Sequence, residues 1–177
     1  LALRLCMCAL VLFRALSLYA DGKGSISRKM IHMAGIDVKP AYVFPTHEFF
    51  AGNNATFSPI RKNLSVHLKY GFKFAPDTYF GRMYPHAVQG IGVGYNTFFH
   101  SSELGNPWSV YAFQTSRIAS LTPRLSLDYE WNFGASFGWK KYDAESNPYN
   151  RVVGSKMNAY IHLSFLLNWQ LDAQTNL

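Results

Sequence analysis

The most constraining feature of this 177-residue chain is a regular alternation of apolar and polar residues over unusually long stretches. It runs through residues 60–74, 125–139 and 157–171. In the second stretch the odd positions are apolar or aromatic from Leu125 to Trp139, and Ser, Asp, Glu, Asn and Gly lie between them. Successive side chains of a β-strand point to opposite faces, so each stretch predicts a strand with one apolar and one polar face.

The length of these strands indicates what surrounds them. Strands of soluble proteins average about five or six residues, whereas roughly fifteen residues at about 3.3 Å each and a tilt near 45° rise about 35 Å. That rise is enough to cross the apolar band, about 25 Å tall, of a membrane barrel. A charge on the lipid face would cost roughly 2–4 kcal/mol at the bilayer midplane, and the three apolar rows carry a single charge, Lys62, near a strand end.

Aromatic residues close several of these rows, as girdles at the two membrane interfaces would. They are Tyr70, Phe72, Trp139 and Trp169. Together with the strand lengths, they predict an all-β fold, an antiparallel up-and-down transmembrane β-barrel.

Three weaker strands are predicted at residues 36–44, 88–99 and 108–118. The first contains Pro40, which has no N–H to donate to the ladder and so predicts a bulge. The second contains Gly90-Ile-Gly-Val-Gly94. These glycines have the wrong spacing for a phosphate loop and no helix follows them, so they are interpreted as small inward residues that leave room in a narrow barrel. For the third strand the pattern leaves open which face is apolar.

Six strands are too few for a complete barrel. An open edge cannot be satisfied in lipid, and single-chain bacterial barrels begin at roughly eight strands, in even number. We therefore expect a barrel of eight strands, with six in this chain and two beyond Leu177. The connecting segments are predicted at 45–59, 75–86, 100–107, 121–124 and 140–151.

Composition excludes other classes of protein. The longest apolar run, Leu5 to Phe13, has nine residues, and a spanning helix needs about 20. Hydrophobic residues make up 49% of the chain, which excludes disorder. The net charge of +7 suits an anionic partner such as phosphorylated lipid, but the basic residues form no run that would predict a nucleic-acid patch.

The first 20 residues are interpreted as a secretory signal peptide whose true start is missing. Arg4 precedes the apolar run, and Ala20 ends the segment before a polar stretch. The alternative is a short buried helix. Cys6 and Cys8 both lie in this segment, and no Cys/His spacing predicts a zinc site. Residues 21–177 would then form a partial outer-membrane barrel domain.

One pair of residues invites a catalytic interpretation. His162 and Ser164 are two positions apart and therefore share the polar face of one strand. A histidine can act as general base for a serine nucleophile, with a carboxylate such as Asp128 or Glu130 orienting the imidazole. The alternative is structural: lumens are filled with such groups, and the carboxylates would pair with Arg117 or Lys156.

Particular stretches of the chain are similar to those of a known family. On these stretches the chain, from about residue 34 to residue 171, resembles the acyloxyacyl hydrolases, which are lipid A deacylase-like outer-membrane barrels of Gram-negative bacteria. The stretches are Pro40–His47, Gln89–Tyr95, Leu127–Gly134 and Asn147–Asn150.

The resemblance implies an eight-stranded barrel with a catalytic His-x-Ser followed by Asn on a late strand, and an acidic residue about a dozen positions later. Here His162-Leu-Ser164 is followed by Phe165, and position 176 is Asn176. No catalytic residue is therefore carried over, and the family's catalytic strand is expected just after Leu177.

By this resemblance we expect a hydrolase with a Ser/His/acid mechanism that removes an ester-linked acyl chain from lipid A, with no metal or other cofactor. Its partners would be lipopolysaccharide as substrate and outer-membrane lipid. Two alternatives stay open. One is a non-enzymatic outer-membrane barrel with a structural or adhesive role, and the other is a soluble lipocalin-like barrel whose apolar rows face inward.

Overall fold

The chain folds into one antiparallel β-sheet. The computed structural model describes residues 13–20 and 29–171. Each strand pairs with the next one in the sequence. The strands are β1 (Phe13–Ala20), β2 (Met30–Tyr42), β3 (Lys62–Phe74), β4 (Val88–Thr97), β5 (Gly105–Ser120), β6 (Leu125–Trp139) and β7 (Met157–Trp169), with two short helices, α1 (Glu48–Ala51) and α2 (Tyr79–Met83).

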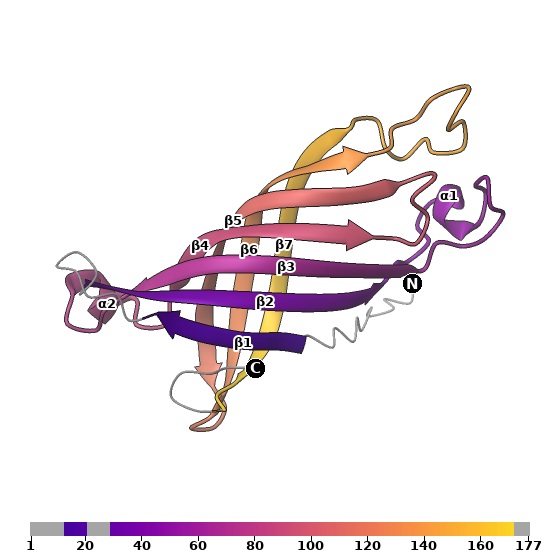
Figure 1. The fold of residues 1–177 in the computed structure, drawn as a ribbon. Helices are drawn as coiled ribbons and strands as arrows, with labels where there is room; N and C mark the ends of the chain where they lie inside the picture. The colour runs from indigo at the N-terminus through magenta and orange to yellow at the C-terminus, as the bar shows by residue number, and fades with distance from the viewer. Residues whose placement is uncertain (1–12, 21–28, 172–177) are drawn as a thin grey trace, which may run out of the picture.

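The sheet curls into a half-barrel, so that β6 and β7 turn behind the layer formed by β2, β3 and β4 (Figure 1). Its edges are β1 and β7, and no ladder joins these two strands within the described residues. No helix in the described ranges is long and apolar enough to cross a membrane. The all-β, antiparallel, up-and-down architecture predicted from the alternation is confirmed.

All six predicted strands are present, and one more precedes them. The additional strand, β1, lies in the segment interpreted as a signal peptide, where the alternative was a short helix. Cleavage of that segment stays a prediction, and Cys6 and Cys8 lie outside the described residues. The bounds of β6 are those predicted, whereas β2 begins earlier than expected and β5 is longer at both ends.

The predicted bulge at Pro40 is wrong. The ladder between β2 and β3 runs in continuous register from Met30 to Tyr42, with Pro40 opposite Leu64. On its other side β1 pairs with β2 only as far as Val38. Pro40 therefore lies where β2 has one described neighbour. A proline, which has no N–H to donate to a ladder, is tolerated where a strand is paired on one side.

The apolar rows lie on the outer, convex face of the sheet and are exposed. On β7 the row from Met157 to Trp169 is more than half exposed at each large apolar side chain, up to 73% for Ile161. The polar rows point inward and are buried or half-buried. This is the opposite of the lipocalin-like alternative, in which the apolar rows would face inward. The open question about β5 is resolved as well, because Trp108 and Val110 point outward while Tyr111 is buried inside.

Glycines of β4 make room for large side chains in the interior. A Cβ atom on Gly92 would overlap the Tyr111 ring, and one on Gly94 would overlap the His67 imidazole. The interpretation of these glycines as small inward residues is therefore confirmed.

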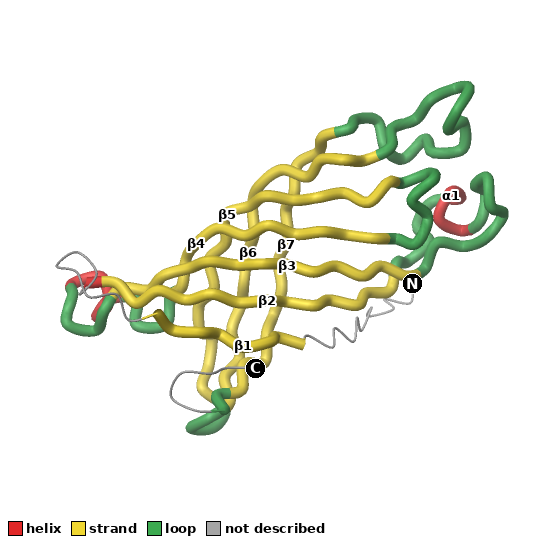
Figure 2. Tube along the Cα trace, in the orientation of Figure 1, coloured by secondary structure: helices red, strands yellow, loops and turns green. Residues whose placement is uncertain are grey.

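The two ends of the sheet differ (Figure 2). At one end, here called the turn end, α2 and the tight turn 121–124 connect strands. At the other, the loop end, α1 and the segments after β4 and β6 pack together around a small apolar core of Phe49, Ile60, Leu104 and Val153. Trp139 belongs to this loop core: its ring lies 5.7 Å from that of Phe98, so it does not extend the outer row as predicted.

Candidate functional site

The polar interior of the half-barrel is the candidate functional site. Side chains from β2 to β7 converge there and are shielded from solvent by the curl of the sheet. Buried polar and charged residues of these strands include Asp37, Lys39, Ser65, His67, Lys69, Ser109, Thr115, Ser126, Asp128, Glu130, Asn132, Ser136 and Ser164.

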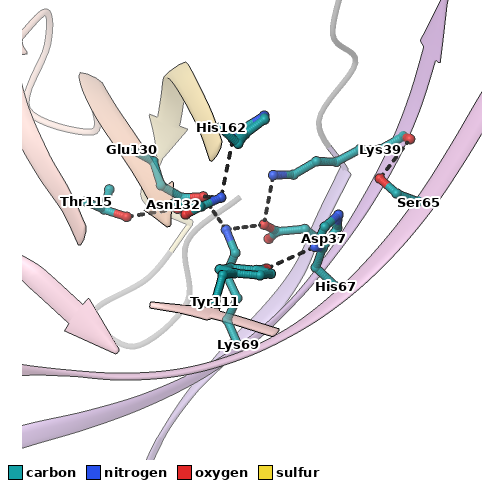
Figure 3. Close-up of polar contacts among 10 residues, drawn as sticks. All are labelled: Asp37, Lys39, Ser65, His67, Lys69, Tyr111, Thr115, Glu130, Asn132 and His162. Atoms are coloured by element: carbon teal, nitrogen blue, oxygen red, sulfur yellow. Dashed lines mark hydrogen bonds and ion pairs between the residues drawn. The ribbon is translucent and has the colours of Figure 1, made fainter. Parts of the chain in front are cut away.

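An ion-pair cluster occupies the centre of this interior (Figure 3). The Lys69 ammonium lies 2.6 Å from the Asp37 carboxylate and 2.5 Å from that of Glu130. Lys39 approaches Asp37 at 3.6 Å. Thr115 donates its hydroxyl hydrogen to Glu130 at 2.9 Å. Two lysines therefore face two carboxylates, and mutual pairing offsets the cost of burying four charges.

The cluster continues to the far edge of the sheet. The Asn132 side-chain amide donates to Glu130 at 3.4 Å, and it lies 3.3 Å from Nδ1 of His162. Polar contacts thus run without a break from Lys39 on β2 to His162 on β7. This chain of contacts braces the curled sheet across its interior.

A second group of aromatic and imidazole side chains fills the space beside the ion pairs. Nδ1 of His67 lies 2.9 Å from the Tyr111 hydroxyl. The Tyr111 ring lies 5.1 Å from that of Tyr160, which stacks nearly parallel to His162. The hydroxyl and imidazole groups are thereby held in fixed positions by ring packing as well as by hydrogen bonds.

The structure places the predicted pair, His162 and Ser164, on the inner face of β7, as the alternation requires. It does not bring them into a catalytic arrangement. Ser164 is 5% exposed, and its hydroxyl has no hydrogen-bond partner among the described residues. Nδ1 of His162 faces Asn132 instead. That this part of the chain holds no catalytic residue stays a prediction.

The predicted carboxylate network is present, with Arg117 as one of its predicted cations and without Lys156. Arg117 pairs with Asp128 at 3.5 Å, and Asn168 donates to the same carboxylate at 3.0 Å. Lys156 is exposed at the loop end, where β7 begins, far along the strand from Asp128 near the turn end. It therefore takes no part. Glu130 pairs with Lys69. The alternation placed Lys69 on the polar face of its strand but did not predict its partners.

A cavity opens in the interior at the turn end. Its lining includes the basic residues Lys73, His86 and Arg117. It also includes Asp128, Glu130 and Asn168. The described ranges contain no group of three or more His, Cys, Asp or Glu side chains arranged to hold a metal ion.

Comparisons with protein-family models, with curated proteins and with solved structures give no match for this chain.

Proposed function

We propose that this chain forms most of the wall of a bacterial outer-membrane β-barrel whose complete form hydrolyses an acyl ester of lipid A. The observation that carries the membrane part is the reversal of the usual burial pattern. Rows of Leu, Ile, Val, Phe and Trp cover the convex face, while charged and polar residues are buried in the concave one. Water-soluble monomers rarely expose apolar patches of this extent.

Strand length supports the same proposal. The strands β2, β3 and β7 have 13 residues each, and β6 has 15. Thirteen residues at about 3.3 Å each, tilted by roughly 45°, rise about 30 Å, more than the apolar band of about 25 Å. In lipid, every backbone polar group of such a strand must be paired, which antiparallel ladders on both sides achieve.

The direction of the strands supports a barrel of eight. With β1 retained as a barrel strand, which excludes cleavage of residues 1–20 as a signal peptide, β1 and β7 run the same way and cannot pair antiparallel. An even number of strands is needed for closure. We propose that the complete barrel has eight strands, the smallest number typical of bacterial outer-membrane barrels.

The enzymatic part rests on the resemblance alone, because the resembling stretches lie in the scaffold of the barrel. Asp128, Glu130 and Asn132, from the stretch Leu127–Gly134, build the interior network. Asn150, from Asn147–Asn150, is fully buried and donates its amide hydrogens to the backbone carbonyls of Glu103 and Lys140. These stretches form the scaffold of the sheet and loop end, which is the part a family of barrels would share.

One experiment tests both parts. The gene would be expressed in a Gram-negative host, outer membranes would be isolated, and lipid A would be analysed by mass spectrometry. Recovery of the protein in the outer membrane with loss of one ester-linked acyl chain from lipid A supports the whole proposal. Recovery in the outer membrane with unchanged lipid A would support the barrel and contradict the hydrolase activity. A water-soluble protein would contradict both.

A non-enzymatic outer-membrane barrel is the second candidate. The observation that favours it is the neutral central cluster, in which two lysines and two carboxylates satisfy one another. Mutual pairing offsets the cost of burying these charges, which is a structural role. Unchanged lipid A in the experiment above would support this candidate.

A further inference from the structure

Two phenylalanines at the loop end are exposed in a backbone conformation that phenylalanine disfavours. Phe57 has a φ of 49° and is 78% exposed, and Phe99 has a φ of 60° and is 62% exposed. They are the non-glycine residues with positive φ in the described ranges. In this region the Cβ atom crowds the backbone, which makes a bulky residue there an outlier that points to function when its surroundings enforce it.

The surroundings of Phe57 enforce its conformation. Asn54, which is fully buried, clamps the turn from both sides. Its amide donates to the carbonyl of Ser58 at 2.7 Å, and its carbonyl oxygen accepts from the backbone N–H groups of Thr56 and Ser58. Phe57 is therefore held at the tip of a turn that its own side chain does nothing to stabilise.

Phe99 belongs to the neighbouring loop, and the two loops are joined. The residue after each phenylalanine takes part in the joint: the Ser58 hydroxyl lies 3.2 Å from Nε2 of His100. A second hydrogen bond joins the same two loops: the Ala55 N–H donates to the buried Glu103 carboxylate. The two phenylalanines are thus parts of one braced platform at the loop end.

Aromatic side chains of the outer face lie close to the platform in the sequence. Phe99 comes two residues after β4, in which the Tyr95 ring lies 5.0 Å from that of Trp108 on β5. On β2 the outer face ends in Tyr42, whose ring contacts Phe44 and whose hydroxyl accepts from Arg61 at 3.0 Å. Aromatic rings next to basic side chains are typical of the level at which a barrel meets lipid head groups.

The charge of the loop end fits an anionic partner, because exposed cations outnumber the exposed carboxylates there, which are Glu48, Asp143 and Glu145. Arg61, Lys62, Lys140 and Lys141 are exposed there. Lys140 also donates to the carbonyl of Ser102, in the same loop as Phe99. Cations near the surface of an anionic membrane are attracted to it. A lipid surface therefore matches both the apolar and the charged side chains of the platform.

We infer that Phe57 and Phe99 form an aromatic anchor that enters the interfacial layer of an anionic lipid membrane and fixes the depth of the loop end. This inference rests on the proposed membrane location of the sheet. The loop core holds the two side chains outward before lipid is met, so little ordering is needed when they insert.

Spin labels test the anchor in the full-length protein, with Cys6 and Cys8 replaced by serine. Single labels would be placed by Phe57→Cys, Phe99→Cys and, as a loop control, Glu145→Cys. In vesicles of phosphatidylcholine and phosphatidylglycerol we expect the labels at 57 and 99 to collide with dissolved oxygen more than with a water-soluble nickel chelate, and the label at 145 to do the reverse. Chelate access at 57 and 99 equal to that at 145 would overturn the anchor.

A label at Ile161, through Ile161→Cys, separates the two proposals. If the label at 161 collides mainly with oxygen while those at 57 and 99 collide mainly with the chelate, the anchor is overturned and the barrel proposal stands. If the label at 161 also collides mainly with the chelate, both proposals are overturned.

Asparagine substitutions provide a second test, because asparagine tolerates positive φ. The double variant Phe57→Asn, Phe99→Asn should still fold in detergent. In vesicles, a spin label placed by Phe44→Cys should become several-fold more accessible to the nickel chelate, because the loop end lies less deeply in the lipid. Unchanged access at 44 would count against the anchor.

Discussion

Lys69 on β3 and Glu130 on β6 form a buried ion pair that spans the interior from one side of the curled sheet to the other. Glu130 has no exposed surface, and Asp37 shares the same ammonium group. Because the pair joins strands that are not neighbours in the sheet, it stabilises the curl as well as the ladders.

Lys69→Met should therefore destabilise the protein strongly. The substitution removes the positive charge shared by the buried carboxylates of Asp37 and Glu130. Breaking a buried ion pair in this way lowers the free energy of unfolding by about 3–5 kcal/mol. Urea unfolding in detergent micelles measures the loss. Adding Glu130→Gln should recover part of it, since one lysine and one carboxylate, Lys39 and Asp37, would remain.

The matched control is Lys141→Met, which removes an exposed lysine at the loop end and should change the free energy of unfolding by less than about 0.5 kcal/mol. An equal loss in both variants would show that the interior pair does not stabilise the curl.

Alanine at two inward glycines should be destabilising for steric reasons. In Gly92→Ala the new methyl group meets the Tyr111 ring, and in Gly94→Ala it meets His67. Overpacking of this kind costs about 1–3 kcal/mol. Gly35→Ala is the control, because no atom lies within 4 Å of a Cβ built there. Thermal unfolding that ranks Gly35→Ala with the other two would contradict this account of the β4 glycines.

The outer and inner faces should tolerate charge differently. Ile161→Arg and Phe133→Arg place a charge on exposed apolar rows, at a cost of roughly 2–4 kcal/mol if these rows meet the bilayer midplane. Asn158→Arg changes a side chain on the inner face and should be better tolerated. Heat-modified migration in gel electrophoresis, which reports barrel assembly, would distinguish them. Equal assembly of all three variants, together with solubility without detergent, would contradict the membrane proposal.

The loop after β6 should loosen in acid. Hydrogen bonds from the backbone N–H and hydroxyl of Ser146, and from the N–H of Glu145, lower the pKa of Asp143 below its usual value. A carboxylate with a depressed folded-state pKa adds stability above its unfolded pKa of about 3.9, and this stability is lost as pH falls through the lower folded value. Limited proteolysis between Lys140 and Lys156 should therefore accelerate in that window.

Asp143→Asn is the control for this acid effect, because its side chain keeps an acceptor oxygen but does not titrate in the same range. The variant should lose the acid-dependent increase in cleavage. If cleavage of the variant still rises over the same pH window, another group controls the loop.

The sequence predicted the strands and their faces because both follow from local spacing. A period of two places Ile161 and Asn132 on opposite faces of the sheet, and strand length favoured the apolar face as the outer one. It could not pair Lys69 with Asp37 and Glu130, because those contacts depend on register and curvature across three strands. Trp139 was misplaced for a similar reason: Gly138 has a φ of 88°, which ends the alternation and lets the indole join the loop core.

The last prediction concerns Ser164, the one inward serine that the sequence made a catalytic candidate. Its hydroxyl is buried without a partner in the described residues, and β7 places it opposite Glu130 in the middle of the strand. Ser164→Ala should therefore leave barrel stability unchanged or slightly higher, since no hydrogen bond is lost. Lipid A deacylation, measured by mass spectrometry in cells that express the full-length protein, should stay within a few-fold of wild type. Complete loss of deacylation with normal assembly would instead make His162 and Ser164 a catalytic pair, with Asn132 and Glu130 orienting the imidazole.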